Sequence, residues 1–345
     1  MMSRKGDYVF YESKKFPGVF YGKKRQTRSE KYAWLYQGKG INILSAIGQN
    51  MVDEAVANEH NSIMKEGVLV SFSSKNLVLD DRTVQVLFYI IQKYVKKSRN
   101  ASFFTNNNIL EHFCVELKIT DVAEVFNLTV RGTRKMLDRA INSLYDLSVD
   151  WEEKIKTSTV NGDSVQHFDG HRFRFLSHID EHVENDSDGC FRSGFIRVAL
   201  APEFSRYLLN SANGIWFPVA LYGLSPSRYP ASFAIGLKLI LHFRMNYYKA
   251  NRNYINVETL LSATTSIPNY LAIKNRGEIS RRIYRPLIRA MDALVSEGII
   301  SEWSFINLYT ESEVSPGHVL NKMNYKEFKI LSINFKISDY PKTDI

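Results

Sequence analysis

The stretch KNRGEISRRIYRPLIRAMDALVSEGIISEW, residues 274–303, decides how the fold of this chain can be interpreted. Apolar residues recur in it at every third or fourth position, which places them along one side of a helix: Ile279, Ile283, Leu287, Met291 and Leu294. The opposite side carries Arg281, Arg285, Arg289 and Asp292. Gly298 follows the last apolar turn, where a glycine ends many helices. The sequence therefore predicts a helix with one apolar face and one arginine-rich face.

The residues after this helix alternate between apolar and polar side chains, as a strand does. The bulky apolar residues between 299 and 308 are Ile300, Trp303, Phe305 and Leu308. A basic helix that leads directly into a hairpin is the arrangement of a winged-helix DNA-binding domain. The alternative is an ordinary core helix whose basic face is solvated, and this stretch alone favours neither interpretation.

Pro286 lies inside the predicted helix. In a helix interior proline removes one backbone hydrogen bond and clashes with the preceding turn, which costs about 3 kcal/mol or more. Either the helix kinks at Pro286, or Pro286 lies near the start of a second helix. In the second case Arg281, Arg282 and Arg285 precede the helix that would enter a DNA groove.

Composition and charge favour a polyanionic partner. The chain has 345 residues, enough for two domains, with a formal net charge of +9 and an isoelectric point of about 9.3. Its two cysteines, Cys114 and Cys190, are isolated and predict no disulfide framework. No apolar run is long enough to span a membrane, and the N-terminus lacks a secretory signal. We therefore expect a soluble, cytoplasmic protein.

A second basic helix is predicted in the first half of the chain. A helix from Asp80 or Asp81 precedes it, with apolar residues at Val84, Leu87, Phe88, Ile91, Tyr94 and Val95. A further helical segment is expected at 109–117. A short helix then opens at Thr120, a polar turn follows at 127–129, and residues 130–147 form a longer helix with Leu137, Ile141 and Leu144 inward. This order predicts a helix-turn-helix.

Strand patterns follow each basic helix. Residues 171–183 and 193–202 alternate around the turn sequence NDSDG, which predicts a hairpin, and residues 218–230 have the composition of a linker. The second half repeats the plan with helices at 233–245 and 257–263 and the basic helix. Residues 299–311 and 326–340 are then expected to form a hairpin whose tip is SEVSPGHVLN.

The predicted fold class is α+β, mainly helical, with two tandem winged-helix domains and β-hairpin wings. The domains are placed at 76–225 and 226–345, after a basic N-terminal extension at 1–75. Aromatic residues interleave with the lysines and arginines of residues 1–40. The extension is interpreted either as an arm along DNA phosphates or as a segment whose aromatic side chains pack on the body of the protein.

This order of elements resembles the plasmid replication initiator (Rep) proteins, which bind repeated origin sites through two winged-helix domains. The resemblance rests on LDRAINSLYDLSVDWEE (137–153), GFIRVALAPEFSRYLL (194–209), YPASFAIGLKLILHFRMNYY (229–248), NYINVETLLSA (253–263) and RRIYRPLIRAMDAL (281–294). It implies binding to direct repeats, a dimer-to-monomer switch and recruitment of a host replicative helicase or initiator. Two features depart from the family: the long turn at 264–277 and the N-terminal extension.

The function expected is sequence-specific binding of double-stranded DNA. Arginines on the basic helices are expected to contact guanine edges, and the remaining cations, the wing tips and the N-terminal arm to hold phosphates. Thr133 is expected to contact a phosphate or a thymine methyl group. The DNA-binding candidates are Arg131, Thr133, Arg134, Lys135, Arg139, Lys274, Arg276, Arg281, Arg282, Arg285 and Arg289.

Catalysis and metal binding are not expected. The histidine pairs His167/His171 and His178/His182 are four residues apart, which on a strand separates them by about 13 Å, too far for one zinc ion. No P-loop, GxSxG or kinase motif occurs, so we expect no enzyme and no cofactor. Two alternatives remain: a winged-helix transcriptional regulator without origin activity, and a metal-dependent nuclease that would need His167 or His178.

Overall fold

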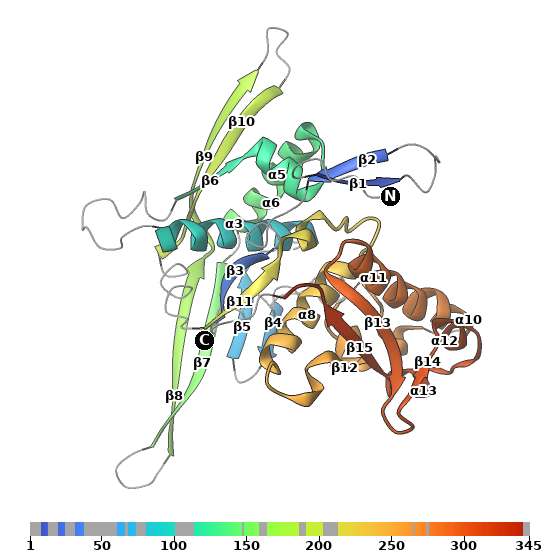
Figure 1. The fold of residues 1–345 in the computed structure, drawn as a ribbon. Coiled ribbons are helices and arrows are strands. Elements are labelled where there is room, and N and C mark those ends of the chain that lie inside the picture. The colour runs from blue at the N-terminus through green and yellow to red at the C-terminus, as the bar shows by residue number, and fades with distance from the viewer. Residues whose placement is uncertain are drawn as a thin grey trace.

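The chain is a mixture of helix and sheet (Figure 1). The structure is a computed structural model that describes residues 8–12, 20–24, 32–37, 61–65, 68–73, 81–100, 114–146, 148–158, 164–185, 191–202, 213–264, 266–273 and 276–340. Within these ranges no helix has the length and apolar character needed to cross a membrane.

The first unit contains three helices and a three-stranded antiparallel sheet. In chain order the elements are α3 (Asp81–Asn100), β6 (Cys114–Lys118), α5 (Ile119–Phe126), α6 (Val130–Asp146), β9 (Leu176–Asn185) and β10 (Phe191–Leu200). The strand order in the sheet is β6-β10-β9. All six apolar residues predicted for the first helix are buried in α3, and Leu137, Ile141 and Leu144 of α6 are buried beside them. The predicted helical faces are therefore confirmed.

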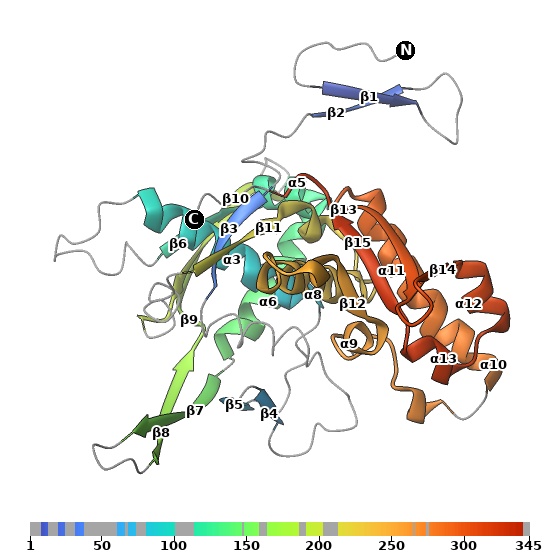
Figure 2. The same cartoon turned by 60° about the horizontal axis from the view of Figure 1, so that its bottom comes forward.

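The second unit repeats this connectivity. Its elements are α8 (Ser232–Met245), β12 (Tyr254–Asn256), α9 (Val257–Leu261), α10 (Arg276–Ile279), η5 (Ser280–Tyr284), α11 (Arg285–Ser296), β13 (Ile300–Asn307) and β15 (Ser332–Ile337). The short helices η3 (Ala250–Asn253) and η4 (Tyr270–Ala272) lie in its loops. The strand order is β12-β15-β13, and β14 (Ser312–Val314) pairs with β13 at the edge. In both units the first strand, β6 or β12, pairs with the last strand, β10 or β15, and the last strand also pairs with β9 or β13. Figure 2 shows α11 against β13, with which it is in contact.

One predicted helix is a strand. The expected helical segment at 109–117 ends in β6, whose residues alternate between buried and exposed positions. Val115 and Leu117 face the core, while Glu116 pairs across the sheet with Arg197 of β10. The alternation of Val115 and Leu117 with exposed neighbours has the period of a strand, and this strand pairs with β10.

A second hairpin is inserted between α6 and β9. Its strands are β7 (Ser148–Ser158) and β8 (Ser164–Arg174), and they continue a sheet with β4 (Asn61–Lys65) and β5 (Val68–Ser73). Residues 171–174 therefore belong to this sheet, and the predicted wing hairpin is formed only by β9 and β10. In Figure 1 the two hairpins extend in opposite directions.

Part of the N-terminal extension is paired with the body of the protein. Strands β1 (Tyr8–Glu12) and β2 (Phe20–Lys24) form a hairpin, and β3 (Tyr32–Gln37) pairs antiparallel with β11 (Asn213–Pro218). The extension thus adds a strand to a segment almost two hundred residues away. The domain limits at 75 and 225 remain predictions.

The predicted tip of the second hairpin is not a loop. Between β13 and β15 lie β14 (Ser312–Val314), α12 (Pro316–Lys322) and α13 (Tyr325–Lys329). Ser315 caps α12, in which Pro316 occupies the first turn, and Asn324 with Glu327 forms a capping box on α13. The turn-forming residues of this segment are therefore helix caps.

The predicted linker at 218–230 is part of the core. Its 3-10 helix η2 (Val219–Gly223) buries Tyr222 against the aromatic rings of Tyr89, Phe126 and Phe217. The buried amide of Gln85 in α3 donates to the carbonyl oxygens of Leu221 and Leu224 at 3.4 and 3.2 Å. These carbonyl groups are buried, so the hydrogen bonds from Gln85 satisfy them and link α3 to the segment 219–224.

Helix α8 contacts both α3 and η2 and is buried on nearly all sides. Phe233 packs against Phe88 of the first unit, and Gly236 lets Leu221 of η2 and Leu294 of α11 approach closely. A Cβ atom at Gly236 would lie 2.5 and 2.8 Å from these two side chains. The sequence pattern predicts an apolar face of Phe233, Leu237, Leu241 and Met245; the first three are buried, and Met245, at the C-terminal end, is 64% exposed. The two units therefore share a continuous core.

Candidate nucleic-acid interface

The basic helix of the second unit is continuous from Arg276 to Ser296 and exposes its arginines. Its five predicted apolar positions are buried, and Arg281, Arg282, Arg285 and Arg289 are all exposed. Gly298 has a φ angle of 68°, and the amide of Ile299 donates to the carbonyl of Leu294 at 2.9 Å. Both faces of the helix and its glycine stop are therefore as predicted.

Pro286 is accommodated by a π-helical turn. Residues of η5 (Ser280–Tyr284) form this turn, and α11 begins at Arg285 with Pro286 in its first turn. A π turn changes the hydrogen-bond register, so the absent proline amide falls at the start of the next α-helical segment. The backbone stays helical at both junctions, with φ near −60° at Ile279 and at Arg285. Arg281 and Arg282 therefore lie on the wider turn of one continuous helix.

A single carboxylate engages two of these arginines. Glu278, in the first turn of the helix, accepts from Arg281 at 3.1 Å through Oε1, and its Oε2 lies 3.5 Å from Arg282. Within the part of the chain that the structure describes, Arg285 and Arg289 form no ion pair. The exposed face thus combines two paired arginines with two that are open to a ligand.

The turn before the basic helix is fixed by an aromatic stack. The ring of Tyr270 in η4 lies parallel to that of Tyr325 in α13, with centroids 4.1 Å apart and an interplanar angle of 2°. Lys274 lies outside the described residues. Arg276 begins α10, and its side chain also lies outside them. The phosphate contacts expected of these two residues remain predictions.

In the first unit the turn between α5 and α6 is as predicted, but Thr133 is not a surface residue. Asn127 has a φ of 52°, and the amide of Leu128 donates to the carbonyl of Ala123 at 2.9 Å. Thr133 is fully buried, and its hydroxyl donates to the carbonyl of Thr129 at 3.0 Å. The DNA contact predicted for Thr133 is therefore wrong: it lies on the inner side of α6, where it stabilises the first helical turn.

Replacing Thr133 with valine tests this assignment. Valine keeps the shape of the side chain and removes the hydroxyl donor, so we expect the free energy of unfolding to fall by about 1 kcal/mol. DNA affinity should stay within about twofold of wild type, since the side chain cannot reach a ligand. Urea denaturation and a binding titration measure the two quantities. A large loss of affinity with unchanged stability would contradict the structural role.

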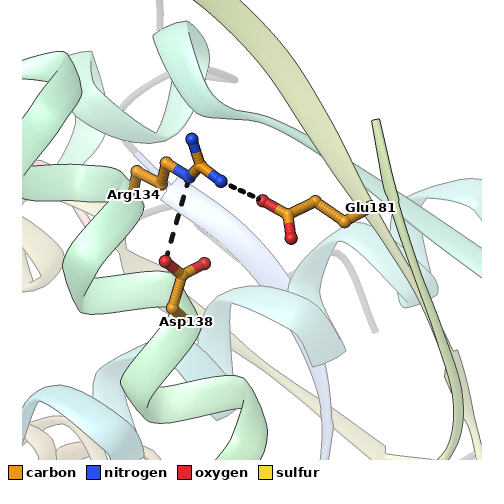
Figure 3. A network of polar contacts seen from close by, with 3 residues as sticks. All are labelled: Arg134, Asp138 and Glu181. Atoms are coloured by element: carbon orange, nitrogen blue, oxygen red, sulfur yellow. Dashed lines mark hydrogen bonds and ion pairs between the residues drawn. The ribbon is translucent and has the colours of Figure 1, made fainter. Parts of the chain in front are cut away.

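Arg134 connects the basic helix of the first unit to its hairpin. Its guanidinium contacts Glu181 of β9 at 3.0 Å and Asp138 of α6 at 3.9 Å (Figure 3). Partial burial, and then the charge of Glu181, raise the pKa of the Asp138 carboxyl, while Arg134 lowers it. The network orients β9 relative to α6. In this conformation the guanidinium of Arg134 faces protein carboxylates.

The other cations of α6 are exposed along one side of the helix. Arg131, Lys135 and Arg139 are exposed, and their spacing of four residues places them on one side of the helix. Within the described residues, Arg131 and Lys135 form no ion pair. Of the DNA-binding candidates on α6, these three therefore have positively charged side chains exposed to solvent.

The turn of the second hairpin is acidic. Between β13 and β14 it exposes Leu308 and Tyr309, by 52% and 84%, beside Glu311. The nearest lysine or arginine after Phe305 in the sequence is Lys322. Carboxylates repel phosphates, which argues against the phosphate contact expected of this wing tip. The tip of the first hairpin, at 186–190, lies outside the described residues.

The histidines that suggested a metal site have other contacts. His178 lies 2.8 Å from Asp180, and the ring of His182 stacks on Phe195. Among the described residues, no group of three histidine, cysteine, aspartate or glutamate side chains is placed to hold a metal ion. The side chains of His167 and His171 in β8 lie outside the described set.

Neither a protein-family model nor a curated protein sequence matches the chain. Among solved structures it is similar to RctB domains 2 and 3, at 15% identity and a TM-score of 0.46, over 86% of this chain and 97% of that one. It is also similar to the Pi initiator protein in complex with iteron DNA, at 10% identity and a TM-score of 0.46, over 91% and 100% of the two chains. At these identities and TM-scores the likeness carries no argument about function, and the function of this chain is argued from its own residues.

Proposed function

We propose that the chain is a sequence-specific double-stranded DNA-binding protein with two winged-helix domains, and that it acts as a replication initiator at an origin with repeated sites. The observation that carries the DNA-binding part is the exposed face of the helix at 276–296. Arg281, Arg282, Arg285 and Arg289 lie together on it, away from the buried apolar stripe. The proposal assigns the chain no reaction of its own and no cofactor.

The repeated connectivity of the two units supports a paired reader. Each unit contains a short helix, a turn and a longer helix with exposed cations, followed by a hairpin of the same sheet. In a winged-helix domain this longer helix enters the major groove. Two such helices joined by a packed core favour a site that covers two successive major grooves, about 10 bp apart.

The roles proposed for the cations differ between the two helices. Arg281, Arg282, Arg285 and Arg289 would form bidentate contacts to guanine, each worth about 1–3 kcal/mol of discrimination. Arg131, Lys135 and Arg139 would contact bases or phosphates in the adjacent groove. Arg134 would do so only after leaving Glu181, so we assign it a positioning role. Lys274, Arg276 and the basic extension would hold phosphates.

Selection of bound duplexes from a random pool, followed by salt titration of the selected sequence, tests DNA recognition. The proposal predicts a defined motif that spans two major grooves. The logarithm of the binding constant should fall with the logarithm of salt concentration, with a slope of about −0.9 for each phosphate contacted. Weak binding without a motif would contradict specific recognition.

The initiator role follows the resemblance of the sequence to plasmid Rep proteins and needs a separate experiment. The gene with its flanking DNA should sustain replication of a circle that lacks any other origin. Binding of the selected motif without such replication would instead favour a transcriptional regulator. Homodimers and a contact with a host helicase or initiator are further parts of this proposal, and both can be detected by sedimentation of the purified proteins.

A further inference from the structure

Glu278 is a carboxylate on a surface that is otherwise cationic. It lies in the first turn of the helix at 276–296, and its two oxygens contact different arginines, Arg281 and Arg282. Its side chain is 36% exposed, while those of Arg281 and Arg282 are 73% and 44% exposed. All three groups therefore occupy the solvent side of the helix, near the end that contacts base edges in winged-helix and related domains.

The two arginines make it feasible for a carboxylate to approach DNA. An isolated carboxylate would be repelled by phosphates, whereas Glu278 is flanked by two positive charges within hydrogen-bonding or ion-pairing distance. An ionised carboxylate has about four acceptor positions, so pairing with arginine leaves positions for a further donor. In the major groove, the exocyclic N4 amino group of cytosine is the donor that glutamate typically reads.

The exposed ion pairs are weak enough to rearrange on DNA. Each is worth at most about a fivefold factor in an equilibrium constant. A bidentate arginine contact to guanine is worth about 5- to 150-fold. Exchange of Arg281 or Arg282 from Glu278 to guanine is therefore favourable, and it releases carboxylate oxygens that then need a donor.

We propose that Glu278 is a specificity-determining residue that accepts a hydrogen bond from the N4 amino group of a cytosine, next to guanines contacted by Arg281 and Arg282. This inference rests on the proposed DNA-binding function. The three side chains form one reader of G·C base pairs, in which the arginines recognise guanine and the glutamate recognises cytosine. The site selected by the wild-type protein should therefore contain one position at which cytosine is preferred by about fivefold or more.

The test compares duplexes selected by wild-type protein and by Glu278→Gln and Glu278→Ala variants of the full chain. Glutamine pairs with adenine N6 and N7, so Glu278→Gln should change the preference at that one position from cytosine to adenine. Glu278→Ala should make the position indifferent. The guanine positions should persist in both variants, because the arginines remain.

Glu302→Gln is the matched control. Glu302 is also an exposed carboxylate paired with a cation, Lys336 at 3.7 Å, but it lies on β13 and not on the helix. This variant should select the wild-type motif. If Glu278→Gln fails to fold, the alanine variant, with glutamate replaced by a strong helix former, carries the test.

The outcomes separate the two proposals. A wild-type motif whose cytosine position is unchanged in Glu278→Ala, or a motif without a preferred cytosine, would overturn the role of Glu278 and leave DNA recognition intact. A wild-type protein that selects no motif would overturn the proposed function and this role with it. A change from cytosine to adenine confined to one position would establish the inference.

Discussion

Replacing both Arg281 and Arg285 with alanine is expected to weaken binding to the selected duplex by about 2–6 kcal/mol, because each arginine supplies about 1–3 kcal/mol of base recognition. Both side chains are exposed and lie off the apolar stripe that packs the helix into the core. Thermal stability should therefore remain close to that of wild type. A fluorescence titration with the selected duplex and a thermal melt measure the two properties.

The control for this double variant removes the same charge elsewhere. The side chains of Lys329 and Lys336 are 41% and 67% exposed, and their ion-pair partners, Glu258 and Glu302, lie off the basic helix. Replacing both lysines with alanine should reduce affinity much less. Equal losses in the two double variants would mean that binding depends on net charge alone. A lowered melting temperature in the arginine variant would mean that these side chains support the fold.

Replacing Tyr222 with alanine is expected to lower the free energy of unfolding by about 3–5 kcal/mol, the range for removing a large buried ring. Tyr222 is fully buried, and its ring contacts Tyr89 and Phe126 of the first unit and Phe217 of β11. Burial raises the pKa of its hydroxyl well above the usual value, so the side chain stays neutral. Urea denaturation followed by circular dichroism gives the change.

Tyr248→Ala provides the matched control, since the same atoms are removed from a side chain that is 78% exposed. Its effect should stay within about 0.5 kcal/mol. A similarly small effect of Tyr222→Ala would show that the segment 218–230 is a linker that contributes little to the stability of the core. Because the two units share their core through this residue, the Tyr222→Ala protein should still unfold in one transition at a lower urea concentration.

The elements that could be predicted from the sequence are those whose evidence is local. The helical faces of 81–100 and 276–296 follow from apolar spacing, and the helix stop at Gly298 follows from the conformational freedom of glycine. The exposure of Arg285 and Arg289 follows from the same spacing. Each of these properties depends on residues within one or two helical turns.

Errors arose where the deciding partner lies far away in the chain. Residues 114–118 form a strand because β10, about eighty residues later, pairs with them. The place of Thr133 in a basic helix predicts a surface position, but its side chain is buried and its hydroxyl donates to the carbonyl of Thr129. The expected hairpin tip instead contains α12, which Ser315 caps and which contacts η5 of the basic helix, about thirty-five residues earlier in the chain.

The ion pairs of the candidate interface also fall into two groups, those between neighbours on one helix and those between residues far apart in the sequence. Glu278 is three and four residues from its arginines, so helical spacing contains the signal that would have revealed it. Glu181 is forty-seven residues from Arg134, and only the approach of β9 to α6 brings them together.

Apolar spacing in the sequence predicts the helices at 81–100, 130–146 and 276–296 with their apolar and basic faces, because periodicity and capping act over a few residues. Contacts in the folded protein turn Arg134 toward Glu181 and bury Leu221, Tyr222 and Leu224 in the core. They also pair a strand of the N-terminal extension with β11. Strand pairing, ring packing and the Arg134–Glu181 ion pair depend on contacts between residues that are distant in the chain, and apolar spacing along one segment contains no information about them.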